Sequence, residues 1–116
     1  MIKVNDFVNT WIDEVGAKHS AYKKKLLSAP NLERYKIKRG TEIVCDNAFC
    51  HYYSLKSVTI PETVIEIGDY SFSGCRSFIN MQKLSQIAII GENAFHRFLS
   101  HIQTDNVLKE YVKFLR

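Results

Sequence analysis

Residues 55–78 read LKSVTIPETVIEIGDYSFSGCRSF, and the spacing of the apolar residues in this stretch recurs on both sides of it. Three dipeptides mark the recurrence, each 23 residues from the next: Ala48-Phe49, Ser71-Phe72 and Ala94-Phe95. Apolar residues keep the same interval five positions before each phenylalanine, at Val44, Ile67 and Ile90. Because one coincidence of this kind arises easily but a series of them does not, the chain contains an internal repeat.

The repeat extends beyond the three dipeptides in both directions. Residues 32–37, LERYKI, are equivalent to residues 55–60, LKSVTI, at the same interval of 23 residues. The later equivalents have diverged more, with FINMQK at 78–83 and HIQTDN at 101–106. The sequence therefore predicts about three and a half repeats over residues 31–103.

A repeat of this length with the pattern L-x-x-hydrophobic-x-hydrophobic is typical of leucine-rich repeats. A single unit cannot bury its apolar face alone, so neighbouring units stack and align their strands in a parallel sheet. We therefore expect an α/β solenoid. Because alternate residues of a strand point to opposite faces, Leu55, Val58 and Ile60 are expected to face the core. The three phenylalanines are expected to fill the space between the strands and the return segments.

The quoted stretch resembles the BspA-like leucine-rich repeats, which are found in bacteria and some protozoa. It matches that family's pattern at Leu55, Val58, Ile60, Pro61, Val64, Ile67, Gly68, Phe72 and Cys75. Three positions depart from it: Ser71 replaces the usual Ala, Phe78 replaces Leu, and Cys45 replaces Gly in an earlier copy. The resemblance covers Leu32 to roughly Leu99. It implies a repeat fold that binds a partner rather than an enzyme.

Both ends of the chain are predicted to be helical caps, because an open solenoid exposes its core at each end. Apolar residues at three- and four-residue steps predict one helix over residues 4–16 and another over about 20–28, in which Lys23, Lys24 and Lys25 face solvent. A similar stripe predicts a helix over residues 104–116. We thus expect one domain, 1–116, with a helical cap at 1–30, repeats at 31–103 and a final helix.

Outward-facing positions of the predicted strands form two polar columns, which we expect to line a concave, partner-binding face. One column holds Arg34, Ser57, Asn80 and Gln103, and the other holds Lys36, Thr59, Gln82 and Asp105. The plainer alternative is that these are ordinary solvated strand residues. The polar columns nevertheless favour a protein–protein interaction module, acting as a small regulator or inhibitor.

The first third of the chain is strongly basic. The net charge of +4 arises there, since residues 1–40 contain nine Lys or Arg and four Asp or Glu. Besides Arg34 and Lys36, this basic region contains Lys18, Lys23, Lys24, Lys25, Lys38 and Arg39. Such a patch favours an acidic protein partner. Two alternatives remain: nucleic-acid contact, with Tyr22 and Tyr35 stacking on bases, and self-association of a structural repeat fragment.

The sequence predicts no catalytic, metal or cofactor site. The four His residues form no recognisable ligand motif, and the three Cys residues, Cys45, Cys50 and Cys75, fit neither a zinc motif nor a paired disulfide framework. One alternative is a metal site formed by His51 and His96 beside Cys50 on the rim. Another is a Cys50 nucleophile with His51, although no third group accompanies that pair. With neither a secretory signal nor a long apolar stretch, a cytoplasmic location without membrane contact is expected, unless an export signal has been trimmed.

Overall fold

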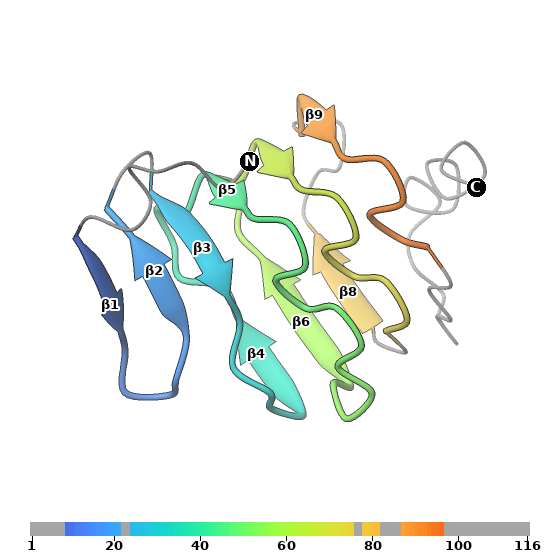
Figure 1. The fold of residues 1–116 in the computed structure, drawn as a ribbon, viewed down its shortest axis with the longest axis horizontal. Coiled ribbons are helices and arrows are strands. Elements are labelled where there is room, and N and C mark those ends of the chain that lie inside the picture. Colours follow the sequence, from blue (N-terminus) through green and yellow to red (C-terminus); the bar gives the residue numbers. More distant parts are fainter. Residues whose placement is uncertain (1–8, 22–23, 76–77, 82–86, 97–116) are drawn as a thin grey trace.

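The computed structural model describes residues 9–21, 24–75, 78–81 and 87–96, and these residues form nine short strands in two sheets (Figure 1). The larger sheet has the order β1-β2-β3-β5-β7-β9, with bounds Thr10–Ile12, Lys18–Ser20, Lys25–Ser28, Ile43–Val44, Glu66–Ile67 and Ile89–Ile90. The smaller sheet has the order β4-β6-β8, with bounds Arg34–Lys36, Ser57–Ile60 and Phe78–Met81.

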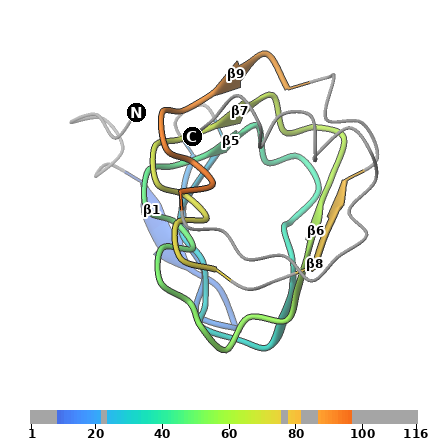
Figure 2. The same ribbon diagram turned by 90° about the vertical axis from the view of Figure 1, so that its right-hand side faces the viewer.

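From β3 onward the chain passes alternately between the two sheets, and each strand pairs in parallel with its equivalent in the next repeat. The 23-residue interval sets the pairing from β5 to β9, where Ile43 lies beside Glu66 and Glu66 beside Ile89, whereas β3 pairs with β5 at an interval of 18 residues. Figure 2 shows the chain winding around the core, with strands β6 and β8 on one side and the connecting loops on the opposite side. The repeat read from the sequence is therefore the structural unit.

The core lies between the two sheets and contains the residues that the repeat predicts. Leu55, Val58 and Ile60 are buried, as expected. The rings of Phe49 and Phe72 stack with centroids 4.7 Å apart, and those of Phe72 and Phe95 with centroids 5.5 Å apart. Stacked repeats bring equivalent side chains to about the spacing of neighbouring strands, which is ~4.8 Å.

The predicted helical cap is wrong wherever the structure describes it. Residues expected in helices over 4–16 and 20–28 instead form β1, β2 and β3, in which β1 and β2 make an antiparallel hairpin and β2 pairs antiparallel with β3. Strand β3 pairs in parallel with β5 and so supplies backbone hydrogen bonds to an edge that would otherwise be exposed. Residues 1–8 of that cap, and the helix expected over 104–116, lie outside the described residues.

The third repeat departs from the 23-residue interval in the smaller sheet. Ser57 pairs with Phe78 and Thr59 pairs with Asn80, an interval of 21 residues. Eight positions separate Phe49 from Ser57, whereas six separate Phe72 from Phe78. The connection before β8 is therefore shorter by two residues, and the one after it is longer by two, because β7 and β9 return to the 23-residue interval.

Candidate interaction surface

The outward face of the smaller sheet is polar and basic at its β4 end. Arg34 and Lys36 are exposed on β4, and Ser57 and Thr59 are half-buried beside them on β6. Tyr35, between the two basic residues, points inward and is buried. The structure thus brings together these four of the eight residues predicted for the binding face, and a fifth, Asn80, lies beside them on β8.

The predicted columns are wrong in the third repeat. Asn80 was expected beside Ser57, but the backbone pairs it with Thr59, which places Lys36, Thr59 and Asn80 in one row. The prediction assumed a fixed interval of 23 residues and therefore did not allow for the shorter connection before β8. Gln82, Gln103 and Asp105 lie outside the described residues.

The predicted basic patch divides between exposed and buried positions. Lys24, Lys38 and Arg39 are exposed, and Lys18 is half-buried on β2. Lys25 was expected to face solvent, but only 4% of it is exposed, because it lies in β3 between β2 and β5. Lys23 lies outside the described residues.

Four residues of this patch line one pocket of about 270 Å³, which we call the basic pocket. It lies between the β2–β3 turn and the β4–β5 loop, and its cationic residues are Lys24, Lys25, Lys38 and Arg39. Trp11 and His19 line it as well. Arg39 also makes an ion pair with Glu62, so part of this charge is already compensated.

A second cavity, of about 480 Å³, separates the β1–β2 turn from β4, and we call it the hairpin groove. Its residues are Asp13, Glu14 and Val15 on the turn, and Leu32, Arg34, Tyr35, Lys36 and Lys38 along β4. Burial, together with the negative charges of Asp13 and Glu14, raises the pKa of Tyr35 to about 12. The phenol therefore stays neutral. Sequence reasoning missed this groove because it predicted a helix where the turn lies.

Comparison with known proteins identifies the family of this fold. Residues 21–113 match the family model described as "BspA type Leucine rich repeat region (6 copies)". The chain belongs to this BspA-type family. No curated protein and no solved structure matches it. The hairpin wall of the groove, residues 10–20, precedes the part that matches the BspA-type repeats, so the groove joins the repeat region to a segment outside it.

The hairpin beside the BspA-type repeats is held in shape by Asp13. Its carboxylate accepts hydrogen bonds from the backbone N–H groups of Val15 and Ala17 and from the ring of His19, at 2.9–3.1 Å. Burial opposes ionisation of this carboxyl, but the hydrogen bonds outweigh it and lower the pKa of Asp13 below its ordinary value. Trp11 stacks on His19 with ring centroids 5.1 Å apart. These contacts position the wall that faces β4.

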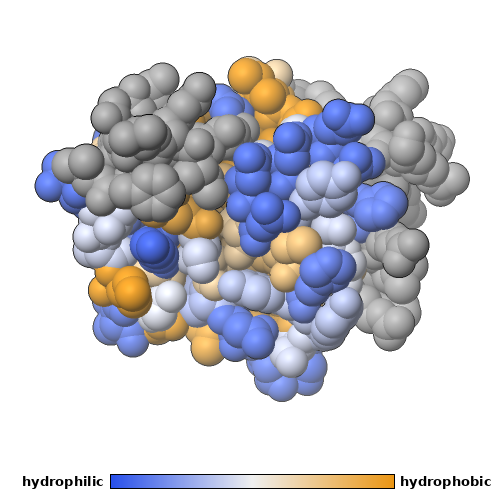
Figure 3. Space-filling view, in the orientation of Figure 1, coloured by the Kyte–Doolittle hydropathy of each residue, from blue (hydrophilic) through white to orange (hydrophobic). Residues whose placement is uncertain are grey.

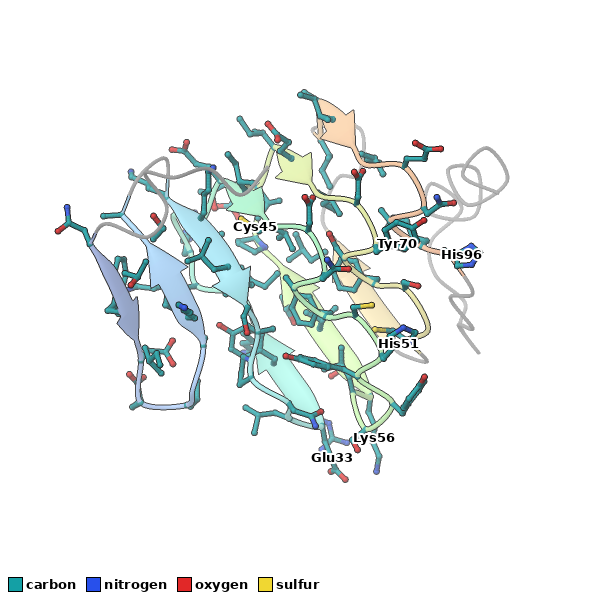
Figure 4. The ribbon with its side chains drawn as sticks, in the orientation of Figure 1. Glu33, Cys45, His51, Lys56, Tyr70 and His96 are labelled. Atoms are coloured by element: carbon teal, nitrogen blue, oxygen red, sulfur yellow. The ribbon has the colours of Figure 1, made fainter. Side chains whose placement is uncertain are left out.

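The loops of the BspA-type repeats present an aromatic rim, of which sequence reasoning named His51 and His96 but missed their partners Tyr53 and Tyr70. The hydroxyl of Tyr53 lies 3.0 Å from Nδ1 of His51, and Tyr70 packs edge-on against His96. Figure 4 shows Tyr70 and His96 side by side, and Figure 3 shows hydrophilic residues gathered over these loops. Asn47, Tyr70 and Asn93 occupy equivalent positions in successive repeats and all have positive φ, so the same turn recurs in each loop.

Potential metal ligands and thiols are the remaining reactive groups among the residues that the structure describes. There, no group of three potential metal ligands comes together. Cys45, Cys50 and Cys75 are free thiols, and burial raises the pKa of Cys75 to about 12. That thiol is therefore a poor nucleophile at neutral pH. No helix among the described residues is long and apolar enough to cross a membrane.

Proposed function

We propose that this chain is a non-enzymatic protein-recognition module that binds its partner through the outward face of β4 and β6. The observation that supports the proposal most directly is the row of exposed cationic residues, Arg34 and Lys36, beside the small polar residues Ser57 and Thr59. Leucine-rich repeats generally use their exposed strands to contact other proteins. The module would be a short solenoid, and its excess positive charge would attract an acidic partner.

The test is an affinity capture from host lysate with two variants of equal net charge. In Arg34→Gln/Lys36→Gln the charge is removed from the proposed face. In the control, Lys18→Gln/Lys56→Gln, it is removed from residues that line neither the groove nor the basic pocket. We expect a discrete protein partner that the wild type and the control retain and the face variant loses. Equal retention by all three proteins would contradict the proposal.

Nucleic-acid binding is the second candidate, and the basic pocket favours it. Lys24, Lys38 and Arg39 gather there beside Trp11, which is 43% exposed and offers an aromatic surface. The stacking role expected for Tyr35 is not supported, because that side chain is buried. Titration of random single-stranded DNA at increasing salt separates the candidates. Two results together would favour this second function: a steep loss of wild-type affinity as salt increases, and a loss of affinity at constant salt in Lys24→Gln/Lys38→Gln.

A further inference from the structure

The two sheets end unequally on the side of the hairpin. Beyond β3 the larger sheet continues through β2 and β1, whereas the smaller sheet stops at β4 (Figure 1). Among the described residues, no strand pairs with β4 on the side away from β6. The hairpin groove lies on that side, since residues of the β1–β2 turn and of β4 line it together. The groove therefore lies where another strand of the smaller sheet would be.

The backbone of β4 presents hydrogen-bonding groups to this groove. The carbonyl of Glu33 accepts from the N–H of Ser57, and the N–H of Ile37 donates to the carbonyl of Thr59. In a parallel ladder, alternate residues bond to the same neighbour, so Glu33, Tyr35 and Ile37 direct their backbone groups toward β6. Arg34 and Lys36 direct theirs the other way. Such an edge is a template for a strand of another chain.

The side chains around the groove define what such a strand would contain. Val15 and Leu32 are exposed apolar residues on its opposite walls, 45% and 37% exposed, and suit apolar side chains. Arg34, Lys36 and Lys38 line the β4 side, and none of them makes an ion pair with a described carboxylate. The neighbouring carboxylate, that of Glu33 immediately before β4, is paired with Lys56 at 3.4 Å. On the turn, Asp13 is paired with His19, which leaves Glu14 as the acidic residue facing the groove.

We propose that the open edge of β4 binds an extended segment of a protein partner, in which acidic residues alternate with apolar ones. The segment adds a strand to the smaller sheet by hydrogen bonding to the backbone of Arg34 and Lys36. Its acidic side chains lie beside those of Arg34, Lys36 and Lys38, and its apolar side chains contact Val15 and Leu32. This inference rests on the proposed function and specifies the chemistry and binding mode of the partner.

The test uses a fluorescein-labelled ten-residue peptide of alternating Glu and Val, with binding measured by fluorescence anisotropy. Two further peptides are controls: one with Lys in place of Glu, and one N-methylated at alternate amides so that one edge cannot donate hydrogen bonds. We expect the Glu peptide to bind, and the Lys peptide to bind at least tenfold more weakly. The peptide that is N-methylated along the edge facing β4 should also bind at least tenfold more weakly than the Glu peptide.

Variants of Lys36 separate charge from hydrogen bonding. Lys36→Gln removes the charge alone, whereas Lys36→Pro also removes the N–H that points into the groove and leaves the β4–β6 ladder intact, since proline is tolerated at strand edges. We expect Lys36→Gln to weaken binding several-fold and Lys36→Pro to weaken it more than tenfold, with Lys18→Gln, which lines neither cavity, as the control. Circular dichroism checks that each variant is folded, and slower hydrogen exchange of the Lys36 amide in the wild-type complex reports the edge directly.

The outcomes distinguish this inference from the proposed function. Equal affinity for the N-methylated peptide, unchanged exchange at Lys36, or no binding of the Glu peptide overturns the strand-addition model. If Ser57→Arg/Thr59→Arg abolishes peptide binding while Lys36→Pro retains it, the ligand crosses the face of the sheet and only the inference fails. The proposed function fails separately, when the lysate capture is insensitive to Arg34→Gln/Lys36→Gln.

Discussion

Phe72 occupies the centre of the phenylalanine stack, between Phe49 and Phe95, and its side chain is fully buried. Phe72→Ala should lower the free energy of unfolding by about 3–5 kcal/mol, because it leaves a cavity that both neighbouring rings line. Urea denaturation measures the loss. Ile65→Ala, at a position that is 47% exposed, is the control and should have a much smaller effect. An unchanged midpoint for Phe72→Ala would show that this ring does not hold the repeats together.

Gly68 is required by the close approach of neighbouring turns. A Cβ atom added there would lie 2.6 Å from the backbone nitrogen of Asp46 in the preceding repeat. The equivalent Cys45 follows β5, and its side chain packs with Leu27 and Ile43 in a small second core. The departure from the family pattern at Cys45 therefore has a physical explanation, since a side chain at that position has space that Gly68 lacks.

Gly68→Ala should accordingly destabilise the protein by about 1–3 kcal/mol, the usual cost of overpacking. Thermal and urea unfolding measure the change, and Ser54→Ala, at an exposed turn position, is the control. Wild-type stability in Gly68→Ala would mean that the turns of neighbouring repeats lie further apart than described.

At the scale of the elements, the sequence predicted the repeat strands well and the cap poorly. Leu55, Val58 and Ile60 were placed inward from their two-residue spacing, and the structure confirms this. The cap was misassigned because Val8, Trp11, Ile12 and Val15 have helical spacing, whereas the pairing of β3 with β5 decides the conformation. Local periodicity does not report that long-range pairing. The groove was missed for the same reason, since one wall comes from the hairpin.

The hairpin should be sensitive to acid because the pKa of Asp13 is below its ordinary value in the folded protein. A lowered carboxyl pKa contributes stability above the unfolded value of 3.8, and this contribution is lost as the pH falls below that value through the folded pKa. The urea midpoint followed by fluorescence of Trp11, the single tryptophan, should therefore fall over this pH range. Asp13→Asn should remove this pH dependence, while Glu14→Gln, which does not bond to His19, should preserve it.

At the scale of the whole molecule, one core connects the hairpin turn to the last described repeat. The buried cluster runs without a break in contacts from Ala17 to Phe95. The hairpin and the repeats should therefore unfold together, and the transition followed by Trp11 fluorescence should coincide with that followed by far-UV circular dichroism. A fluorescence transition at lower denaturant would show instead that the hairpin opens as a separate unit.

The stacked phenylalanines also determine how such a chain can lengthen. Duplication of one 23-residue unit between Phe49 and Phe72 would insert a further ring into the stack and move the two ends apart by about 4.8 Å, the spacing of adjacent strands. The first and last repeats would keep the contacts that they make with the segments beyond the stack. A partner lying across the strands would gain a row of contacts with every added repeat. A partner bound at the edge of β4 would make the same contacts whatever the number of repeats. Gene length and affinity would thus be coupled in the first case and independent in the second.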